Sequence, residues 1–206
     1  MATEVLLVHG LWMHSIAMCW LAARLREQGF APREFGYYSL LQDTDAVVAR
    51  LAETWAARPG MHVVAHSLGG LLALRAARQL GAGIAGRVVC LGSPLAGSHV
   101  AQGVVKRIPA GDWLVGSNRD LLQAGIGRIP QGIEAGVIAG SVPRGLGGLL
   151  ARFDGPHDGT VAVAETRVPA LADHVVVPAS HSGLLFSEPA ARQAASFLRE
   201  GRFETA

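Results

Sequence analysis

The sequence predicts an α/β protein, in which a parallel sheet of about six strands carries helices on both faces. Short apolar runs rich in β-branched residues alternate with longer stretches of helical periodicity, as in sheets whose strands are joined by helical crossovers. The apolar runs are near-continuous rather than alternating, as strands buried on both faces require. Of the 206 residues, 50% are hydrophobic, which is enough for one domain with a full core.

Strand and helix signals follow one another through most of the chain. Gly29 can close the first helix, Asp43 can cap the second, and Pro189 suits the first turn of the last, where its missing N–H costs little. The strands are expected at residues 5–8, 33–38, 61–65, 87–91, 135–139 and 174–177. The helices are expected at residues 16–28, 44–58 and 68–80, and from residue 187 onward.

Residues 99–132 do not follow this alternation. Glycine, proline and short apolar pieces succeed one another there, and about two short helices are expected. No linker or internal repeat divides the chain, so residues 1–206 are expected to form a single domain. Residues 99–132 would then be a short segment of that domain that walls or caps a pocket.

One stretch, residues 63–70, has the pattern of a nucleophile elbow: VVAHSLGG. An apolar strand ends at His66, Ser67 follows, and a helical run begins with two glycines close behind. Such a strand–turn–helix places the central residue in strained backbone geometry, so small neighbours are needed on both sides. The alternative is that Ser67 is only the N-cap of the helix, a role that serine often takes. The flanking strand and glycines favour the nucleophile.

With His9-Gly10 after the first strand and residues 180–186 (SHSGLLF) near the end, this stretch resembles the α/β-hydrolases, in particular small bacterial lipases and esterases. The resemblance covers nearly the whole chain. It implies a reduced α/β-hydrolase fold, with the second strand outside the first and the other four on the opposite side. The sequence departs from the usual elbow at Ala65, where the family has glycine, although alanine is still small enough to pack.

A serine hydroxyl needs a base to remove its proton, and the base needs an acid to orient it. In this family the three follow in the order serine, acid, histidine. His181 lies just past the last strand, where the family has its base, and His157 is the other histidine in a suitable place. Asp158 precedes Gly159, as in the family's Asp-Gly-x-Val stretch, and Asp154 is its rival. We therefore expect Ser67, Asp158 and His181 to be catalytic.

The resemblance also implies an oxyanion hole formed by the backbone N–H groups of Leu11 and Leu68. Leu11 follows the glycine after the first strand, and Leu68 begins the helix after Ser67. Trp12, Met13 and Trp113 are candidates for the walls of the substrate pocket. For Trp12 and Met13, packing in the core is an equally good interpretation.

Composition excludes several other classes of function. The formal net charge is only +2 without a basic block, which argues against a nucleic-acid partner. No apolar run approaches about 18 residues, so no membrane-spanning segment is predicted. No signal peptide is visible, which favours the cytoplasm. Cys19 and Cys90 are expected to be buried free thiols, and no spacing predicts a metal or a cofactor. The oligomeric state is left open.

These observations together predict a serine hydrolase that acts on carboxylic esters of small or lipid-like molecules through an acyl-enzyme. A thioesterase, an amidase or an acyltransferase would use the same three residues and differ in the pocket. A protein of another class, a hydrolase fold that binds without catalysis, would be expected to lack the serine or the histidine.

Overall fold

A single parallel sheet organises the computed structural model, which describes residues 2–81, 86–109, 111–145 and 152–205. Its strands follow the order β2-β1-β3-β4-β5-β6, and every neighbouring pair is parallel. This confirms the predicted fold class and the predicted position of the second strand outside the first. The strands are β1 (Glu4–Val8), β2 (Ala31–Phe35), β3 (His62–His66), β4 (Val88–Leu91), β5 (Ala135–Gly140) and β6 (Asp173–Val177).

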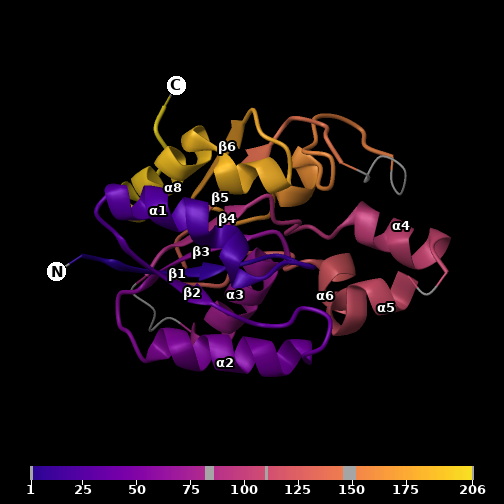
Figure 1. Cartoon of the computed structure of the whole chain (residues 1–206), viewed down its shortest axis with the longest axis horizontal. Helices are drawn as coiled ribbons and strands as arrows, with labels where there is room; N and C mark the ends of the chain where they lie inside the picture. Colours follow the sequence, from indigo (N-terminus) through magenta and orange to yellow (C-terminus); the bar gives the residue numbers. More distant parts are fainter. Residues whose placement is uncertain (1, 82–85, 110, 146–151, 206) are drawn as a thin grey trace.

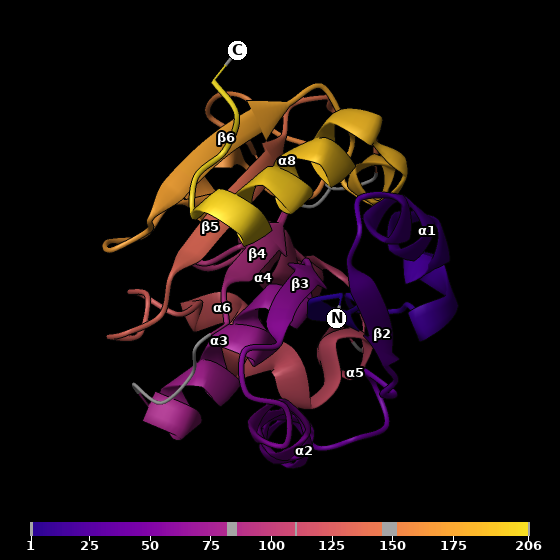
Figure 2. The same ribbon diagram turned by 90° about the vertical axis from the view of Figure 1, so that its left-hand side faces the viewer.

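Helices cover both faces of this sheet (Figures 1 and 2). On one face α1 packs against α8, and on the other α2 packs against α3. These four helices are α1 (Cys19–Glu27), α2 (Thr44–Ala56), α3 (Leu68–Leu80) and α8 (Glu188–Glu200).

The core is divided by the sheet into two hydrophobic layers. Leu6 and Val8 of β1 face the layer with α2 and α3, whereas Val5 and Leu7 face the layer with α1 and α8. All four side chains are buried. Because both faces are covered, each position along the central strands must be apolar, which explains the near-continuous apolar runs in the sequence.

The segment 99–132 forms a separate group of short helices beside the carboxyl ends of the strands (Figure 1). About two helices were expected there, and this count was wrong: the described part of the segment, which omits residue 110, has three and a 3₁₀ turn. The glycines and prolines break the segment into pieces of one to three turns. The three are α4 (His99–Arg107), α5 (Gly111–Val115) and α6 (Arg119–Ala124).

Two smaller expectations are corrected. The second strand ends at Phe35 rather than Tyr38. Beyond it, Tyr37 turns inward, and its hydroxyl donates a hydrogen bond to the carbonyl of His9 at 2.8 Å. Cys19 is exposed, although Cys90 is buried as expected. The buried side of α1 is formed by Leu21, Ala22 and Leu25, and Cys19 lies on its outer side.

Candidate active site

Ser67 occupies a sharp turn between β3 and α3. It is the only residue between the two elements, and its φ of 54° lies in a region that residues other than glycine rarely adopt. The turn brings the start of α3 very close to β1. A Cβ added to Gly69 would lie only 2.5 Å from the carbonyl oxygen of Val8. Ser67 stands at the N-cap position of α3, but its side chain makes no capping hydrogen bond to the helix.

The structure brings Ser67, His181 and Asp158 together in one hydrogen-bonded chain. Nε2 of His181 lies 3.0 Å from Oγ of Ser67, and Nδ1 of His181 lies 2.8 Å from Oδ2 of Asp158. His181 stands in the loop after β6, directly before a short 3₁₀ helix (Ser182–Phe186). Its side chain is 12% exposed, whereas that of Asp158 is 1% exposed. The carboxylate is therefore shielded from water, while the imidazole can be reached from the cavity.

Asp158 is held in place by its own loop. Its Oδ1 accepts hydrogen bonds from the N–H groups of Thr160, at 2.9 Å, and Val161, at 2.7 Å. The other carboxylate oxygen is left for His181. These backbone donors favour the ionised carboxylate and fix its direction.

Asp154 and His157, the alternatives for the acid and the base, are not part of the hydrogen-bonded chain from Ser67 to Asp158. Asp154 is exposed, four residues before Asp158. The His157 ring stacks on Phe153 with centroids 4.0 Å apart, and its Nδ1 accepts a hydrogen bond from the N–H of Gly159 at 3.1 Å. Neither residue takes the position that Asp158 and His181 occupy beside Ser67.

A glycine that the sequence analysis did not single out permits this packing. Gly92 follows β4 with a φ of 56°. A Cβ there would lie 3.1 Å from Oδ2 of Asp158 and 3.2 Å from Nδ1 of His181. It would also lie 2.8 Å from Cδ1 of Leu184. The only signal in the sequence is that Gly92 comes directly after a buried strand, at the edge of the sheet where Ser67 also lies.

Two further histidines lie close to Ser67, and both are buried. Burial, with a smaller effect of the nearby His181, lowers the pKa of His66 to about 3. Its Nε2 lies 2.9 Å from the carbonyl oxygen of His181, and since a carbonyl only accepts, that nitrogen carries the proton. Burial also lowers the pKa of His9, whose ring stacks on Tyr37 with centroids 4.2 Å apart. Both rings are therefore neutral near pH 7.

Two backbone segments approach Ser67, the first turn of α3 and the turn after β1. Leu68 is the first residue of α3, and the first N–H groups of a helix have no acceptor within it. The helix dipole also favours negative charge at this end. Leu11, in the turn after β1, lines the same cavity as Ser67. A Cβ on the preceding Gly10 would approach Cβ of Ser67 to 3.0 Å, so only glycine allows β1 to turn this near to the serine.

A cavity of about 490 Å³, here called the Ser67 cavity, opens above these groups. Ser67, His181 and Leu11 lie on its wall, together with Trp12 and Met13. Much of the remaining wall is apolar and comes from the short helices of segment 99–132. Its main contributors are Val100, Ala101, Val104, Val115 and Leu122. Residues of segment 99–132 thus form much of the apolar wall of the cavity that contains Ser67.

The aromatic pocket candidates are placed differently from one another. Trp12 lines the Ser67 cavity, whereas Trp113 lines a neighbouring cavity of about 390 Å³ that Trp12 and Met13 also reach. Trp12 is exposed, so its interpretation as a core residue is wrong, and Trp113 is exposed as well. Their sequence positions gave no sign that they would lie on the surface.

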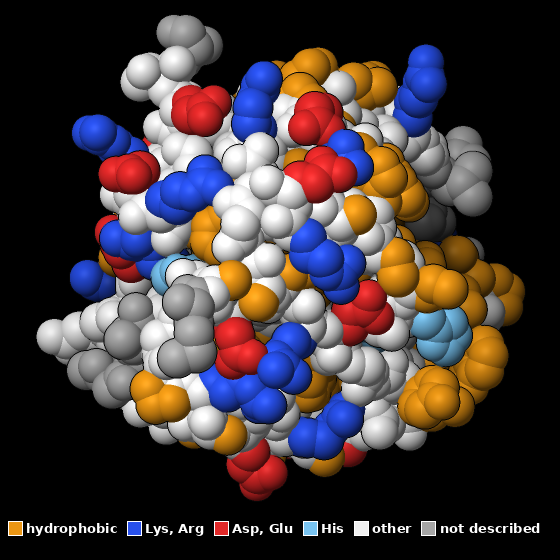
Figure 3. Space-filling view, turned by 60° about the vertical axis from the view of Figure 1, so that its left-hand side comes forward, with side chains coloured by type: hydrophobic (Ala, Val, Ile, Leu, Met, Phe, Trp, Pro, Cys, Tyr) orange, Lys and Arg blue, Asp and Glu red, His pale blue; other side chains and the backbone are white. Residues whose placement is uncertain are grey.

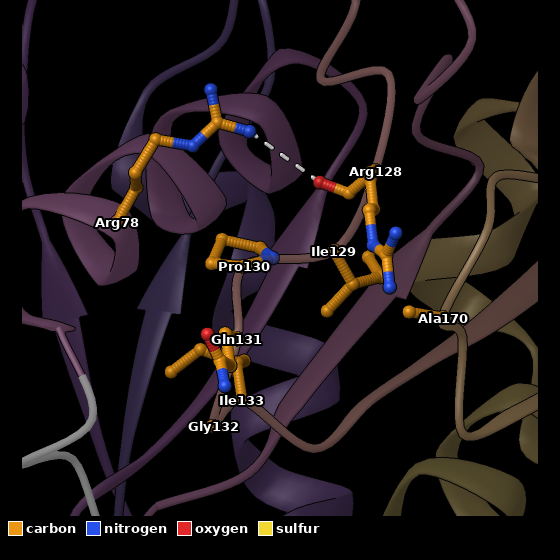
Figure 4. Close-up of a pocket in the computed structure, with 8 residues that line it drawn as sticks. All are labelled: Arg78, Arg128, Ile129, Pro130, Gln131, Gly132, Ile133 and Ala170. Atoms are coloured by element: carbon orange, nitrogen blue, oxygen red, sulfur yellow. Dashed lines mark hydrogen bonds between the residues drawn. The ribbon is translucent and has the colours of Figure 1, made fainter.

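A larger cavity of about 690 Å³ lies elsewhere, between the end of α3 and the loop before β5 (Figure 4). Arg78 extends over it and donates a hydrogen bond to the carbonyl of Arg128 at 3.5 Å. Its described lining has no serine, cysteine, histidine or carboxylate, and a guanidinium stays protonated in proteins. This cavity therefore has no nucleophile or general base. The lining residues are Arg78, Arg128, Ile129, Pro130, Gln131, Gly132, Ile133 and Ala170.

Among the residues that the structure describes, no three His, Cys, Asp or Glu side chains come together in a way that could hold a metal ion. Over the same residues, no helix has both the length and the apolar character needed to cross a bilayer.

The chain was compared with known proteins. No protein-family model and no curated protein sequence matches it. Solved structures match it in fold over almost its whole length. A Bacillus licheniformis lipase in mature form has a TM-score of 0.74 at 18% identity, covering 97% of this chain and 92% of that chain.

Two other solved structures extend this likeness. Phospholipase PlaB from Legionella pneumophila has a TM-score of 0.67 at 14% identity, over 97% of this chain and 61% of that chain. A pyrethroid hydrolase from Sphingobium faniae has a TM-score of 0.62 at 14% identity, over 97% and 98%. At these identities the likeness is one of fold. The chain therefore has the α/β-hydrolase fold and resembles the lipases and esterases built on it.

Proposed function

We propose that this protein is a serine hydrolase that cleaves carboxylic esters with an apolar acyl group. The observation that carries the proposal is the unbroken hydrogen-bonded chain from Ser67 through His181 to Asp158. It stands on a strained turn at the floor of a largely apolar cavity. Strained backbone, an aligned serine and histidine, and a buried orienting carboxylate are the arrangement that nucleophilic catalysis by serine needs.

In the proposed mechanism, Oγ of Ser67 attacks the ester carbonyl carbon while Nε2 of His181 takes the hydroxyl proton. Asp158 accepts the hydrogen bond from Nδ1 of His181, which fixes the ring and stabilises its cation. The negative charge that develops on the carbonyl oxygen is held by the N–H groups of Leu68 and Leu11. His181 then gives its proton to the departing alcohol, and the acyl group stays on Ser67.

Water completes the cycle. His181, neutral again, removes a proton from a water molecule that attacks the acyl carbon, and the same N–H groups hold the second oxyanion. The bond from Ser67 to the acyl group breaks, the proton returns to Oγ, and the carboxylic acid leaves. His66 and His9 stay neutral beside these steps, so they place no positive charge next to His181 when it becomes a cation.

The test is a set of hydrolysis rates with the purified protein. We expect p-nitrophenyl esters to be cleaved, with kcat/KM rising with acyl length as the chain fills the apolar wall of the Ser67 cavity. Ser67→Ala should lower kcat by about 10⁴- to 10⁶-fold while the fold is kept. A folded Ser67→Ala protein with near wild-type activity would contradict the proposal. Matched thioesters and amides in the same assay distinguish a thioesterase or an amidase.

A further inference from the structure

The cavity beside the Ser67 cavity has no part in the mechanism above. It measures about 390 Å³, and we call it the Trp12 groove. Trp12 and Met13 line both spaces, so they form the wall between them. The remaining large apolar side chains of the groove come from the loop after β2 and from α5. They are Tyr38, Leu40, Leu41 and Trp113.

The groove exposes large apolar side chains to water. Trp12 is 58% exposed, Tyr38 58%, Leu41 83% and Trp113 70%. In a space-filling view, hydrophobic side chains gather around an exposed histidine at one edge of the molecule (Figure 3). Exposed apolar surface costs free energy, and a cluster of it on a protein surface marks a place where something apolar binds.

Trp12, which lies in the wall between the Ser67 cavity and the Trp12 groove, is fixed in position. Its φ of 58° is unusual for a bulky residue, and such a conformation persists only where neighbouring groups determine it. Its backbone N–H donates to Oγ of Ser39 at 3.1 Å, and its indole N–H donates to the carbonyl of Leu114 at 2.8 Å. The backbone of Trp12 is therefore held by the loop after β2, and its ring is held by α5.

The opposite wall of the groove is anchored as well. The side-chain amide of Asn118 donates to the carbonyl of Ser39 at 2.5 Å, and the Thr44 hydroxyl donates to Oδ1 of Asn118 at 3.0 Å. All three residues are buried. The loop that carries Tyr38 and Leu41 is thus tied to the helices that wall the Ser67 cavity. A preformed groove binds an apolar group without first having to order its own loops.

The chemistry of an ester offers one apolar group to each of two neighbouring spaces, of which the Ser67 cavity contains the serine and the Trp12 groove lies beyond Trp12 and Met13. The carbonyl carbon carries an acyl group on one side and an alkoxy group on the other, and the two leave it in different directions. We propose that the Trp12 groove is a second apolar subsite, so that the substrates are esters with large apolar groups on both sides of the bond that is cleaved. The acyl group lies in the Ser67 cavity, as proposed above, and the alkoxy group lies beyond Trp12. This inference rests on the proposed function.

The experiment uses four esters, the ethyl and octyl esters of butanoic and octanoic acid. For each protein, kcat/KM is measured and divided by the value for ethyl butanoate, which cancels effects on the reaction itself. Trp113→Ala should lower this ratio about tenfold for octyl octanoate, the size of effect expected for lost apolar contact in a pocket. It should lower the ratio equally for octyl butanoate, whose long chain is the alkoxy group, and leave the ratio for ethyl octanoate unchanged.

Two matched variants complete the design. Val104→Ala, on the wall of the Ser67 cavity, should affect octyl octanoate and the singly long ester that Trp113→Ala spares. Val176→Ser, an exposed apolar position on β6 that lines neither space, should change none of the ratios. If Trp113→Ala changes no ratio, or lowers the ratio for both singly long esters, the groove is not a subsite for one side of the ester.

A second readout does not depend on hydrolysis. A symmetrical ketone with two eight-carbon chains, titrated calorimetrically against Ser67→Ala, reports binding alone. Adding Trp113→Ala should weaken this binding about tenfold, whereas adding Val176→Ser should not. If both additions leave the affinity unchanged, the inference fails even where esters are cleaved. If no ester is cleaved but the ketone binding behaves as described, the proposed function fails and the apolar groove stands.

Discussion

His66 holds the loop that carries His181. Its Nε2–H donates to the backbone carbonyl of His181 at 2.9 Å, while the two rings lie with their centroids 4.7 Å apart. His66 is buried directly beside Ser67 in the chain, so the same turn that presents the serine also fixes the backbone of the proposed base. It touches no reacting atom, and its role is to position His181.

Replacing His66 should therefore impair catalysis more than substrate binding. His66→Leu removes the donor, and we expect kcat to fall between about tenfold and hundredfold, as for small displacements of catalytic groups, while KM changes little. His66→Gln keeps an N–H donor of similar reach and should recover part of the loss. Steady-state kinetics with one p-nitrophenyl ester checks this order. Equal activity of the two variants would show that the hydrogen bond does not position His181.

The stability of the protein should fall in acid, in part because of His66. Burial holds its folded pKa at about 3, while an unfolded histidine titrates near about 6.5. Between these values the unfolded chain binds more protons, so the free energy of unfolding falls as the pH drops from 6.5 toward 3. One such group contributes at most about 1.4 kcal/mol per pH unit. His174, whose pKa is lowered to about 4 mainly by burial, acts in the same direction.

Urea denaturation at pH 7 and pH 5 measures this effect. His66→Gln removes one of the groups, so its free energy of unfolding should depend less on pH over this interval than that of the wild type. If His66→Gln loses as much free energy of unfolding between pH 7 and pH 5 as the wild type does, His66 is not a neutral, acid-sensitive histidine in the folded protein.

Asp158 and Asp154 offer a direct test of which acid orients His181. Asp158→Asn should lower kcat by up to about 10⁴-fold, because an amide cannot hold the ring in the correct tautomer or stabilise its cation. Asp154 is exposed, so Asp154→Asn should change kcat by less than about twofold, as for surface substitutions away from a site. Kinetics of both variants with the same ester checks the ranking, and the reverse ranking would move the acid role to Asp154.

Gly92 should be needed for the packing of Asp158 against His181. Gly92→Ala adds a methyl group that would meet both side chains and Leu184, in a backbone conformation that already strains alanine. We expect a loss of stability of about 1–3 kcal/mol together with a lower kcat, since the crowded groups must move.

Gly29→Ala is the matched control for this variant. Gly29 has a φ of 87° but nothing within 4 Å of an added Cβ, so it carries the backbone strain without the crowding. The Gly29→Ala protein should be less stable than the wild type and have the same kcat. If Gly92→Ala and Gly29→Ala have the same kcat, the contact with Asp158 and His181 is unimportant for activity.

The parts of this fold that follow local rules could be predicted from the sequence. The central strands read clearly because both faces of β1, β3 and β4 are buried, and the elbow at Ser67 is defined within eight consecutive residues. Asp158 and His181 could be selected only through a resemblance in chain order. They lie 91 and 114 positions after Ser67, and no local pattern shows that such distant residues come together in space.

The features that were missed depend on contacts between distant segments. Trp12 is held by hydrogen bonds to Ser39, from its backbone, and to Leu114, from its ring, and these residues are 27 and 102 positions away. Trp113 of α5 lines the Trp12 groove rather than the Ser67 cavity, together with residues 38–41 from the loop after β2. Gly92 is one of 26 glycines, and only its place beside Asp158 and His181 distinguishes it. These properties depend on tertiary contacts, so they cannot be predicted from the periodicity or spacing of residues in the sequence.

Labelling with a fluorophosphonate tests the central claim most directly. This reagent reacts only with a serine whose hydroxyl is activated, so the intact mass of the protein after treatment counts activated serines, and peptide mapping locates them. The account predicts one adduct per chain, on Ser67, that is lost in Ser67→Ala and strongly slowed in His181→Ala. A wild-type protein that stays unlabelled, or that carries its adduct on another serine, would contradict it.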